Sequence, residues 1–358
     1  MTQPELHVFI GTKAQYIKTA PLLWLMDERG VDYRLVDSGQ HAVLGDSFRK
    51  EMGIRPPDVR LGRGADVASI PQALVWTVRL AGSLVSKGRL RATVFGGRGG
   101  VCVVHGDTPS TLLSMVMARR AGLAVAHLEA GLRSGRWLHP FPEEIIRFLV
   151  ARRADLLFAP DEEAVRNLEA MDVKGEIVAL PGNTVLEALR RSDPVGQADG
   201  PVIITMHRVE NLHRRSRREG LASLAEQLAT DRAVRWLLHQ PTASALGKAT
   251  MDRLTRAGVE LGELVGHSEF LGMLGAAPFV ITDGGSIQEE CAMLGVPTLL
   301  WRKRTDRPDG LGENVVLSCY DRSIISDFVS DPDRFRHPVR VPEVSPSEQI
   351  LEALCGWR

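Results

Sequence analysis

The stretch that decides the fold is residues 101–131, which read VCVVHGDTPSTLLSMVMARRAGLAVAHLEAG. The stretch opens on an apolar run that ends in polar residues at 105–107, and a second apolar run follows at 123–131. The segment between them, 110–122, is helix-like and ends at Gly122, a residue that readily terminates a helix. A strand, a crossover helix and a second strand predict a parallel sheet covered by helices.

The same alternation of strand-like and helix-like segments runs through the rest of the chain. The other strand-like segments lie at 6–11, 33–39, 155–160, 201–208, 234–240, 277–285 and 296–302. The alternation pauses at 180–200, which is rich in Pro, Gly and Asp. We therefore predict an α/β protein with two doubly wound, Rossmann-like domains. The first spans 1–179 and is completed by a C-terminal helix at about 343–358, and the second spans 180–342.

Length, charge and cysteine content exclude several classes of protein. A chain of 358 residues is long enough for two domains. Its 44 basic and 44 acidic residues leave no net charge, which argues against a nucleic-acid partner. No apolar run reaches the roughly 18–20 residues of a membrane span, and the N-terminus lacks the pattern of a signal peptide. Because the four cysteines form no CxxC motif, we expect a cytoplasmic protein with reduced thiols.

The sequence also lacks the common motifs for cofactors. No GxGxxG follows a strand and opens a helix, and neither a GxxxxGK[ST] loop nor an HExxH motif is present. The glycines at 96–100 precede a strand-like segment, so they are expected in a turn. No cluster of aspartates suggests a bound divalent metal. We therefore expect a protein that needs no NAD and no metal.

Polar residues follow several of the predicted strands. In open α/β sheets, ligands bind beyond the carboxyl ends of the strands, so these positions are the candidate site. The segment TDGGSIQEE, 282–290, places small residues immediately before a helix, where free backbone N–H groups favour an anion such as phosphate. An ordinary glycine-rich turn explains this segment equally well. Asp107 likewise fits either a site or the N-cap of the helix at 110.

The stretch HLEAGLRSGRWLHPFPEE, residues 127–144, crowds titratable groups into one strand-end loop. With other stretches it resembles the UDP-N-acetylglucosamine 2-epimerases of the non-hydrolysing bacterial type. The matching stretches are GTKAQYIKTAP (11–21), SGQH (38–41), VHGDTPSTL (104–112), HLEAGLRSGRWLHPFPEEIIR (127–147), PGNTVLEAL (181–189), TMHRVEN (205–211), TDGGSIQEECAMLGVPTLL (282–300) and RTDRPDGLGENVVL (304–317). The resemblance implies a GT-B fold, with the active site in the cleft between two domains and UDP held mainly by the second.

The resemblance also implies roles for individual residues. The residues that match the family's catalytic positions are Asp107, Glu129, Glu143 and His207. Those that match positions binding the substrate are Lys13, Lys18, Arg147, Arg208, Gly284, Gly285, Ser286, Glu290 and Arg307. Gln40 and His41 match a second, regulatory UDP-sugar site. Arg133 and His139 are expected in structural or surface contacts rather than in catalysis.

The implied reaction is the reversible conversion of UDP-GlcNAc to UDP-ManNAc, which supplies precursors of cell-surface polysaccharides. The C2 proton of the sugar is not acidic, so the family eliminates UDP to give a 2-acetamidoglucal and adds it back on the other face. Two faces require two acid–base groups in opposite protonation states. The leaving pyrophosphate requires cations and a helix N-terminus. The resemblance further implies a homodimer.

Three departures from the family's pattern keep alternatives open. Lys13 replaces an arginine and loses its bidentate fork, Gln15 replaces a glutamate, and Gly284 replaces a serine. A glutamine at position 15 resembles the branch that acts on UDP-diacetamido uronic acids. The alternatives are that branch, a hydrolysing epimerase that releases UDP and free ManNAc, a GT-B glycosyltransferase, and a catalytically weak UDP-sugar-binding paralog.

Overall fold

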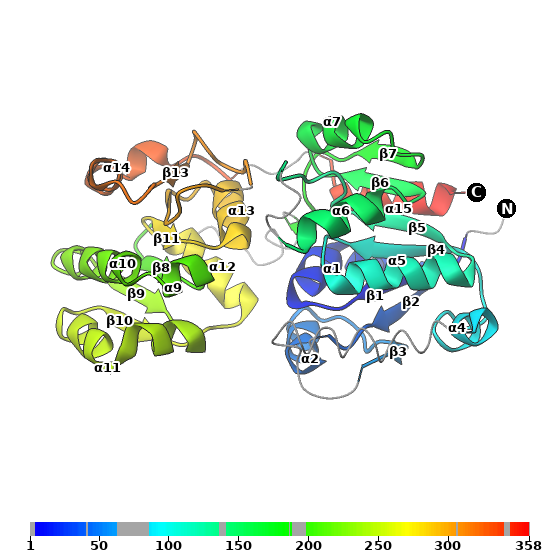
Figure 1. The fold of residues 1–358 in the computed structure, drawn as a ribbon, viewed down its shortest axis with the longest axis horizontal. Coiled ribbons are helices and arrows are strands. Elements are labelled where there is room, and N and C mark those ends of the chain that lie inside the picture. The colour runs from blue at the N-terminus through cyan, green and yellow to red at the C-terminus, as the bar shows by residue number, and fades with distance from the viewer. Residues whose placement is uncertain are drawn as a thin grey trace. The chain divides into compact units, whose positions relative to one another are not determined.

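The computed structural model describes residues 4–40, 42–62, 86–135, 141–185, 187, 198–305, 307–339 and 344–357 (Figure 1). The chain divides into two compact units. Unit 1 is Met1–Ala188 with Pro342–Arg358, and unit 2 is Leu189–Val341. The predicted boundary at 179/180 falls earlier than this division, because Asn183 and Thr184 form hydrogen bonds with residues of unit 1.

Unit 1 contains a seven-stranded parallel sheet in the order β3-β2-β1-β4-β5-β6-β7. Its strands are β1 (Leu6–Ile10), β2 (Tyr33–Asp37), β3 (Val59–Arg60), β4 (Val101–His105), β5 (Ala124–Leu128), β6 (Leu156–Ala159) and β7 (Glu176–Ala179). The strand order reverses between β1 and β4, the point at which doubly wound sheets open a crevice for ligands.

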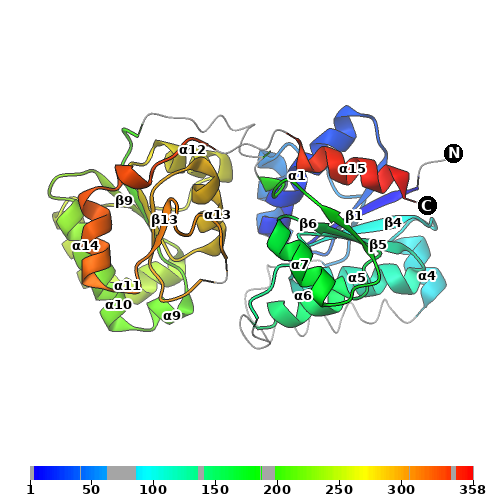
Figure 2. The ribbon, with the colours of Figure 1, turned by 90° about the horizontal axis from the view of Figure 1, so that it is seen from above.

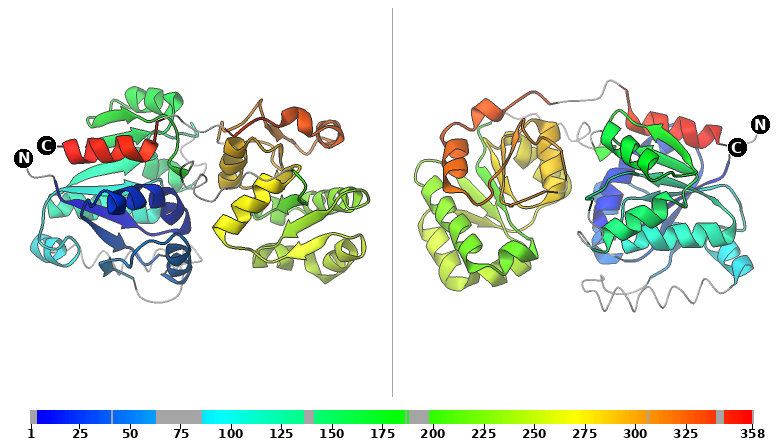
Figure 3. Two further views of the ribbon diagram at one scale, coloured as in Figure 1. Left: turned by 180° about the vertical axis from the view of Figure 1, so that it is seen from behind. Right: turned by 45° about the horizontal axis from the view of Figure 1, so that its top comes forward.

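The described helices of unit 1 cover its sheet. They are α1 (Lys13–Glu28), α2 (Ala42–Glu51), α4 (Lys87–Thr93), α5 (Pro109–Ala121), α6 (Glu143–Ala151), α7 (Glu162–Ala170) and α15 (Pro346–Gly356). The C-terminal helix α15 packs beside α1, so the end of the chain returns to the first unit (Figure 3). The predicted helix at 110–122 is confirmed as α5, whose C-cap Gly122 has a left-handed φ of 82°.

Unit 2 contains a six-stranded parallel sheet in the order β10-β9-β8-β11-β12-β13. Helices surround this sheet (Figure 2). Its strands are β8 (Val202–Thr205), β9 (Val234–Leu237), β10 (Glu260–Gly262), β11 (Val280–Thr282), β12 (Thr298–Leu300) and β13 (Val315–Leu317). Its described helices are α9 (Val209–Leu212), α10 (Arg215–Leu228), α11 (Gln240–Arg256), α12 (His267–Ala276), α13 (Gly285–Leu294), α14 (Arg322–Ser330) and the 3-10 helix η2 (Asp333–Phe335). No described helix combines the length and the apolar character needed to cross a membrane.

Each sheet is buried on both faces, which explains the continuous apolar runs of the sequence. All five residues of β1 and all five of β4 are buried. Each unit has its own apolar core, around Phe95 and Phe158 in unit 1 and around Trp236 and Phe279 in unit 2. The predicted class, two doubly wound α/β sheets, is confirmed. The carboxyl ends of β1, β4 and β5 lie side by side and so bring 11–13, 105–108 and 129 together.

Candidate functional site

Glu129 is the most constrained residue at this edge of unit 1. It follows β5 directly and has a φ of 60°, in the left-handed region that a residue with a side chain rarely adopts. Such backbone conformations cost of order 1–3 kcal/mol and persist only where the surrounding structure holds them. The strained backbone therefore indicates that the orientation of the Glu129 side chain is important for the site.

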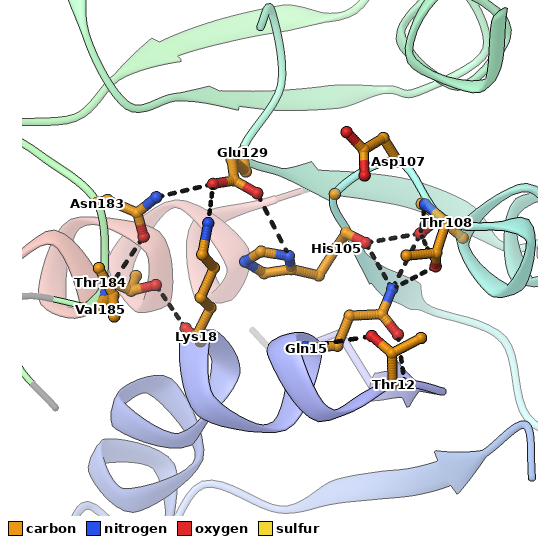
Figure 4. A network of polar contacts seen from close by, with 12 residues as sticks. Thr12, Gln15, Lys18, His105, Asp107, Thr108, Glu129, Asn183, Thr184 and Val185 are labelled. Carbon is orange, nitrogen blue, oxygen red and sulfur yellow. Dashed lines mark hydrogen bonds and ion pairs between the residues drawn. The ribbon is translucent and has the colours of Figure 1, made fainter. Parts of the chain in front are cut away.

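Two donors converge on one oxygen of the Glu129 carboxylate (Figure 4). Lys18 of α1 forms an ion pair with Oε1, and Asn183 donates to the same oxygen at 2.9 Å. The side chains of Lys18 and Glu129 are only 7% and 9% exposed. Lys18, expected to contact the substrate, thus neutralises Glu129 in this structure. The other oxygen, Oε2, faces Nδ1 of His105 at 3.9 Å.

Two buried histidines lie beside the acidic groups. Burial lowers the pKa of His105 to about 4, although the charge of Glu129 opposes this effect. Burial also lowers the pKa of His127, whose Nε2 lies 2.8 Å from the carbonyl oxygen of Gly106. Both imidazoles are therefore neutral near pH 7, and the charges at this edge come from carboxylates, Lys18 and Arg147.

Asp107 and Arg147 form a second charged pair. Nε of Arg147 donates to Oδ2 of Asp107 at 2.7 Å, and Nη2 lies 2.7 Å from the same oxygen. Arg147 is nearly buried, whereas the Asp107 side chain is 24% exposed. The alternative that Asp107 caps the following helix is wrong, because Thr108 is the N-cap of α5 and pairs with Thr111 in a capping box.

The neighbours Glu143 and Glu144 at the start of α6 differ in their surroundings. Glu144 is fully buried, accepts hydrogen bonds from Arg133 at 2.6 Å and from the backbone N–H of Ser134 at 3.0 Å, and so shapes the loop. Burial raises the pKa of Glu144, but these hydrogen bonds outweigh it and hold the pKa below its ordinary value. Oε2 of Glu143, by contrast, is buried without a hydrogen-bond partner among the described residues. His139 lies outside the described residues.

Gln15 holds the strand ends together rather than facing a ligand. Its Oε1 accepts from the backbone N–H groups of Gly11 at 2.7 Å and Thr12 at 3.1 Å. Its Nε2 donates to the carbonyl of His105 at 2.7 Å and to the hydroxyl of Thr111 at 2.9 Å. A glutamate here could not donate to that carbonyl, so the amide suits this network of protein contacts (Figure 4).

The remaining predicted residues of unit 1 lie apart from these pairs. Lys13 is exposed, and its ammonium lies 4.1 Å from the ring centroid of Phe48, a cation–π distance. Gln40 follows β2 and is buried, and its side-chain Oε1 has no hydrogen-bond partner among the described residues. His41 lies outside the described residues.

In unit 2, the buried Asp283 organises the loop that carries His207 and Arg208. Its carboxylate accepts from the backbone N–H of His207 and that of Arg208, each at 3.0 Å. Its Oδ1 also lies 3.3 Å from Nδ1 of His207, which directs Nε2 away from Asp283. Partial burial lowers the pKa of His207, and Asp283 opposes this effect. Asn211, fully buried, donates to Asp283 at 2.9 Å.

Helix α13 begins at Gly285, directly after β11 and the N-cap Gly284, which supplies no side-chain cap. A Cβ on Gly284 would lie 2.9 Å from Cε1 of His207, so a side chain at this position would require the imidazole to shift. A Cβ on Gly285 would lie 3.1 Å from Nε of Arg307. Ser286 is exposed on the first turn. Uncapped N–H groups and a nearby guanidinium make this end of α13 suitable for an anion.

Glu289 and Glu290 point to different partners. Glu289 forms an ion pair with Arg307, which holds that arginine at the start of α13. Oε1 of Glu290 lies 3.0 Å from Nε2 of His267. Oε2 of Glu290 and Nδ1 of His267 are buried and have no hydrogen-bond partner among the described residues. Two buried polar atoms without partners indicate a place where a ligand supplies the missing hydrogen bonds.

Sequence reasoning missed Asn183, Asn211 and His267. Each follows a strand or opens a helix at a carboxyl edge, and His267 is the first residue of α12, shortly after β10. This position near the carboxyl edge of a sheet is the feature of the sequence that could have identified them as site residues. Among the described residues, no group of three or more His, Cys, Asp or Glu side chains is arranged to hold a metal ion.

Comparison with known proteins gives a consistent result. The family model described as UDP-N-acetylglucosamine 2-epimerase matches residues 25–330. The UDP-N-acetylglucosamine 2-epimerase of Bacillus subtilis is 28% identical over 94% of this chain and 90% of its own length. The UDP-2,3-diacetamido-2,3-dideoxy-D-glucuronate 2-epimerase of Pseudomonas aeruginosa is 27% identical over 83% of each chain. A crystal structure of the UDP-GlcNAc 2-epimerase of Neisseria meningitidis bound to UDP-GlcNAc is 25% identical, with a TM-score of 0.81 over 98% of this chain and 99% of that one.

Proposed function

Because the chain belongs to the UDP-N-acetylglucosamine 2-epimerase family, we propose that it interconverts UDP-GlcNAc and UDP-ManNAc, or a closely related pair of UDP-2-acetamido sugars. The route is elimination of UDP to a 2-acetamidoglucal, followed by addition of UDP to the opposite face. A base removes the C2 proton while the C1–O bond to UDP breaks. The reverse steps return a proton to C2 and restore the C1–O bond.

We assign proton transfer to Asp107, Glu129, Glu143 and His207. Glu129 gives the strongest support for this assignment. It is nearly buried, it is held in a strained backbone conformation, and Lys18 and Asn183 both contact one of its carboxylate oxygens. The other oxygen, Oε2, faces Nδ1 of the neutral His105 at 3.9 Å, and we assign proton exchange to this oxygen. Oε2 of Glu143, which has no hydrogen-bond partner among the described residues, supports a second such group. Groups with different surroundings can hold opposite protonation states, which the two faces of C2 require.

We assign UDP to unit 2. The uncapped start of α13 at Gly284 and Gly285, together with Arg307, suits the pyrophosphate, whose charge grows as it leaves. The unsatisfied atoms of Glu290 and His267 suit the hydroxyl groups of a ribose. Arg208, half-buried beside Asp283, is a further candidate for a phosphate contact.

Two observations bear on the identity of the sugar. The Pseudomonas aeruginosa relative acts, by its name, on a diacetamido uronate and is as similar to this chain as the relatives named for UDP-GlcNAc. Gln15 does not favour that substrate, because its amide is used in contacts within unit 1. UDP-GlcNAc is therefore the first substrate to test. As further parts of the proposal, the protein acts as a cytoplasmic homodimer and supplies cell-surface polysaccharide synthesis.

The test is an incubation with UDP-GlcNAc in deuterated water, followed by NMR. The expected result is UDP-ManNAc that carries deuterium at C2. Free ManNAc with UDP would replace the proposal by a hydrolysing epimerase. Turnover of the UDP-diacetamido uronate alone would change the substrate but keep the reaction. UDP-sugar binding without exchange at C2 in either compound would reduce the chain to a binding protein.

A further inference from the structure

Unit 2 contains a cavity lined by several basic side chains, and none of the residues assigned to UDP or proton transfer lines it. Residues of α10 and α14 line it, and it has a volume of about 1050 Å³. Leu224 and Gln227 of α10 line one side, and Ile325 and Val329 of α14 line the other. Trp301, Lys303, Cys319 and Tyr320, which follow β12 and β13, complete it. We call this cavity the α10–α14 groove.

The α10–α14 groove carries a concentration of positive charge in a chain with no net charge. Its lining includes Arg214, Arg217, Lys303 and Arg322. Among the residues that the structure describes, none of these four cations forms an ion pair with a carboxylate. The acidic side chain of the lining, Glu219, is already paired with Arg253 at 2.9 Å. Asp321 directs its carboxylate to backbone N–H groups of its own helix, those of Ser323 and Ile324.

The aromatic floor of the groove holds one of these cations in place. The guanidinium of Arg217 lies 4.2 Å from the ring centroid of Tyr320, a cation–π distance. Cys319 and Tyr320 both have left-handed φ angles, 49° and 62°, so the backbone there is held in a costly conformation that places the ring. Trp301 is 4% exposed and packs edge-on against Tyr320. Arg217 is therefore preorganised rather than free in solvent.

We propose that the α10–α14 groove binds a phosphate or diphosphate group of a small ligand, at a site separate from that for UDP. Four cations that form no ion pair with a described carboxylate attract an anion, and their attraction is stronger beside apolar walls than in open water. Three of the four, Arg214, Lys303 and Arg322, are exposed and can close over an anion without disturbing the core. Arginine in particular matches the oxygen geometry of a phosphate.

The position of Cys319 allows a test that reports on this groove alone. Its thiol is exposed and lines the groove, whereas Cys102 and Cys291 are buried. We expect inorganic pyrophosphate, at constant ionic strength, to slow the alkylation of Cys319 by iodoacetamide, read peptide by peptide by mass spectrometry. At ten times the Kd, the rate falls about tenfold. Cys355, in unit 1 and partly exposed, is the internal control and keeps its rate.

Three variants separate the proposal from its alternatives. Arg214→Gln and Arg322→Gln are chosen because both side chains are exposed, whereas Arg217 and Tyr320 also bond to Asn211. Each variant raises the pyrophosphate concentration needed for protection by about tenfold, the usual effect of losing one charge-assisted contact. Arg256→Gln, an exposed cation at the end of α11 outside the groove, leaves protection unchanged.

Two outcomes would overturn the proposal. The first is equal alkylation of Cys319 with and without pyrophosphate. The second is protection that survives in Arg214→Gln and Arg322→Gln but disappears in Arg307→Gln, because that pattern places the anion at the start of α13 and not in the groove. Neither outcome bears on the epimerase reaction, which the C2 exchange experiment tests by itself.

Discussion

The carboxyl edges of the two sheets are built differently. In unit 1, Glu129 lies against Lys18 and Asp107 against Arg147, so these acids already have cations of the same unit as partners. In unit 2, Glu290 and His267 bond to each other, but each keeps one buried polar atom that has no partner among the described residues. The first arrangement fixes where a carboxylate points, as proton transfer needs, and the second leaves hydrogen bonds for a ligand to complete. On this ground we attribute proton transfer mainly to the first edge, with His207 as the contribution of unit 2, and UDP binding to the second edge.

Replacing Glu129 removes the Lys18–Glu129 ion pair at the edge of unit 1 and gives the largest expected loss of turnover. Glu129→Gln loses turnover by about 10²–10⁴-fold, the usual effect of removing a general acid or base. It also loses about 3–5 kcal/mol of stability, because Lys18 remains buried without its counter-charge. Steady-state rates and urea unfolding measure the two effects separately.

The double variant Lys18→Met with Glu129→Leu is the matched control. Removing both charges restores much of the stability, because no buried charge is left unpaired. Turnover stays low if Glu129 exchanges the proton. Recovery of turnover together with stability would show that Glu129 is only a structural partner of Lys18.

The buried neutral histidine of unit 1 predicts how stability depends on pH. The pKa of His105 in the folded protein is about 4, below its ordinary value of 6.5. Between these two pH values the histidine is therefore protonated in the unfolded chain but neutral in the folded protein. This contribution is complete above about pH 6.5 and is lost as the pH falls toward 4. The loss amounts to about 2 kcal/mol at pH 5. Urea unfolding at pH 7 and pH 5 therefore shows a smaller difference for His105→Asn than for the unaltered protein. An equal difference in both would remove His105 from this account.

A substitution at Glu290 sharpens the comparison from the side of unit 2. Glu290→Gln raises the Kd for UDP by about tenfold, the usual effect of weakening one charge-assisted hydrogen bond. The melting temperature changes little, because Oε2 has no described protein partner to lose. Calorimetric titration with UDP measures the first and thermal unfolding the second. A lower melting temperature with an unchanged Kd would make the Glu290–His267 pair structural.

The smallest expected effect is that of removing metals and nicotinamide cofactors. The sequence contains no motif for NAD and no cluster of metal ligands, so turnover after dialysis against a chelator is expected to stay within experimental error. The assay follows UDP-ManNAc formation before and after dialysis. Activity that disappears and returns on addition of Mg²⁺ or NAD would contradict the expectation.

The sequence predicted the elements that follow a strong pattern. Long apolar runs became β1, β4, β5 and β8, and the positions after them became the candidate site. The four edge strands, β3, β7, β10 and β13, were missed because each has only two to four residues and none forms a continuous buried apolar run. These short strands acquire their conformation from their neighbours in the sheet.

The contacts of the site could not be predicted from spacing. Lys18, Glu129 and Asn183 are far apart in the sequence and meet because the ends of α1, β5 and the segment after β7 converge. Gln15 suggested a change of substrate, yet its amide bonds to the protein. Gly284 suggested a lost phosphate contact, yet the position is crowded by His207. In each case the deciding partner is distant in the sequence.

The adjacent pair Glu143 and Glu144 tests the central claim most directly, because the two differ in surroundings and not in chemistry. The measurement is the rate of C2 deuterium incorporation into UDP-GlcNAc, per folded molecule, for Glu143→Gln and Glu144→Gln. We predict that Glu143→Gln keeps its melting temperature and loses about 10²–10⁴-fold of the rate. Glu144→Gln instead melts earlier, while its rate per folded molecule stays near normal. A near-normal rate in Glu143→Gln, with unchanged stability and UDP affinity, would contradict the account and leave the proton transfers to Asp107, Glu129 and His207.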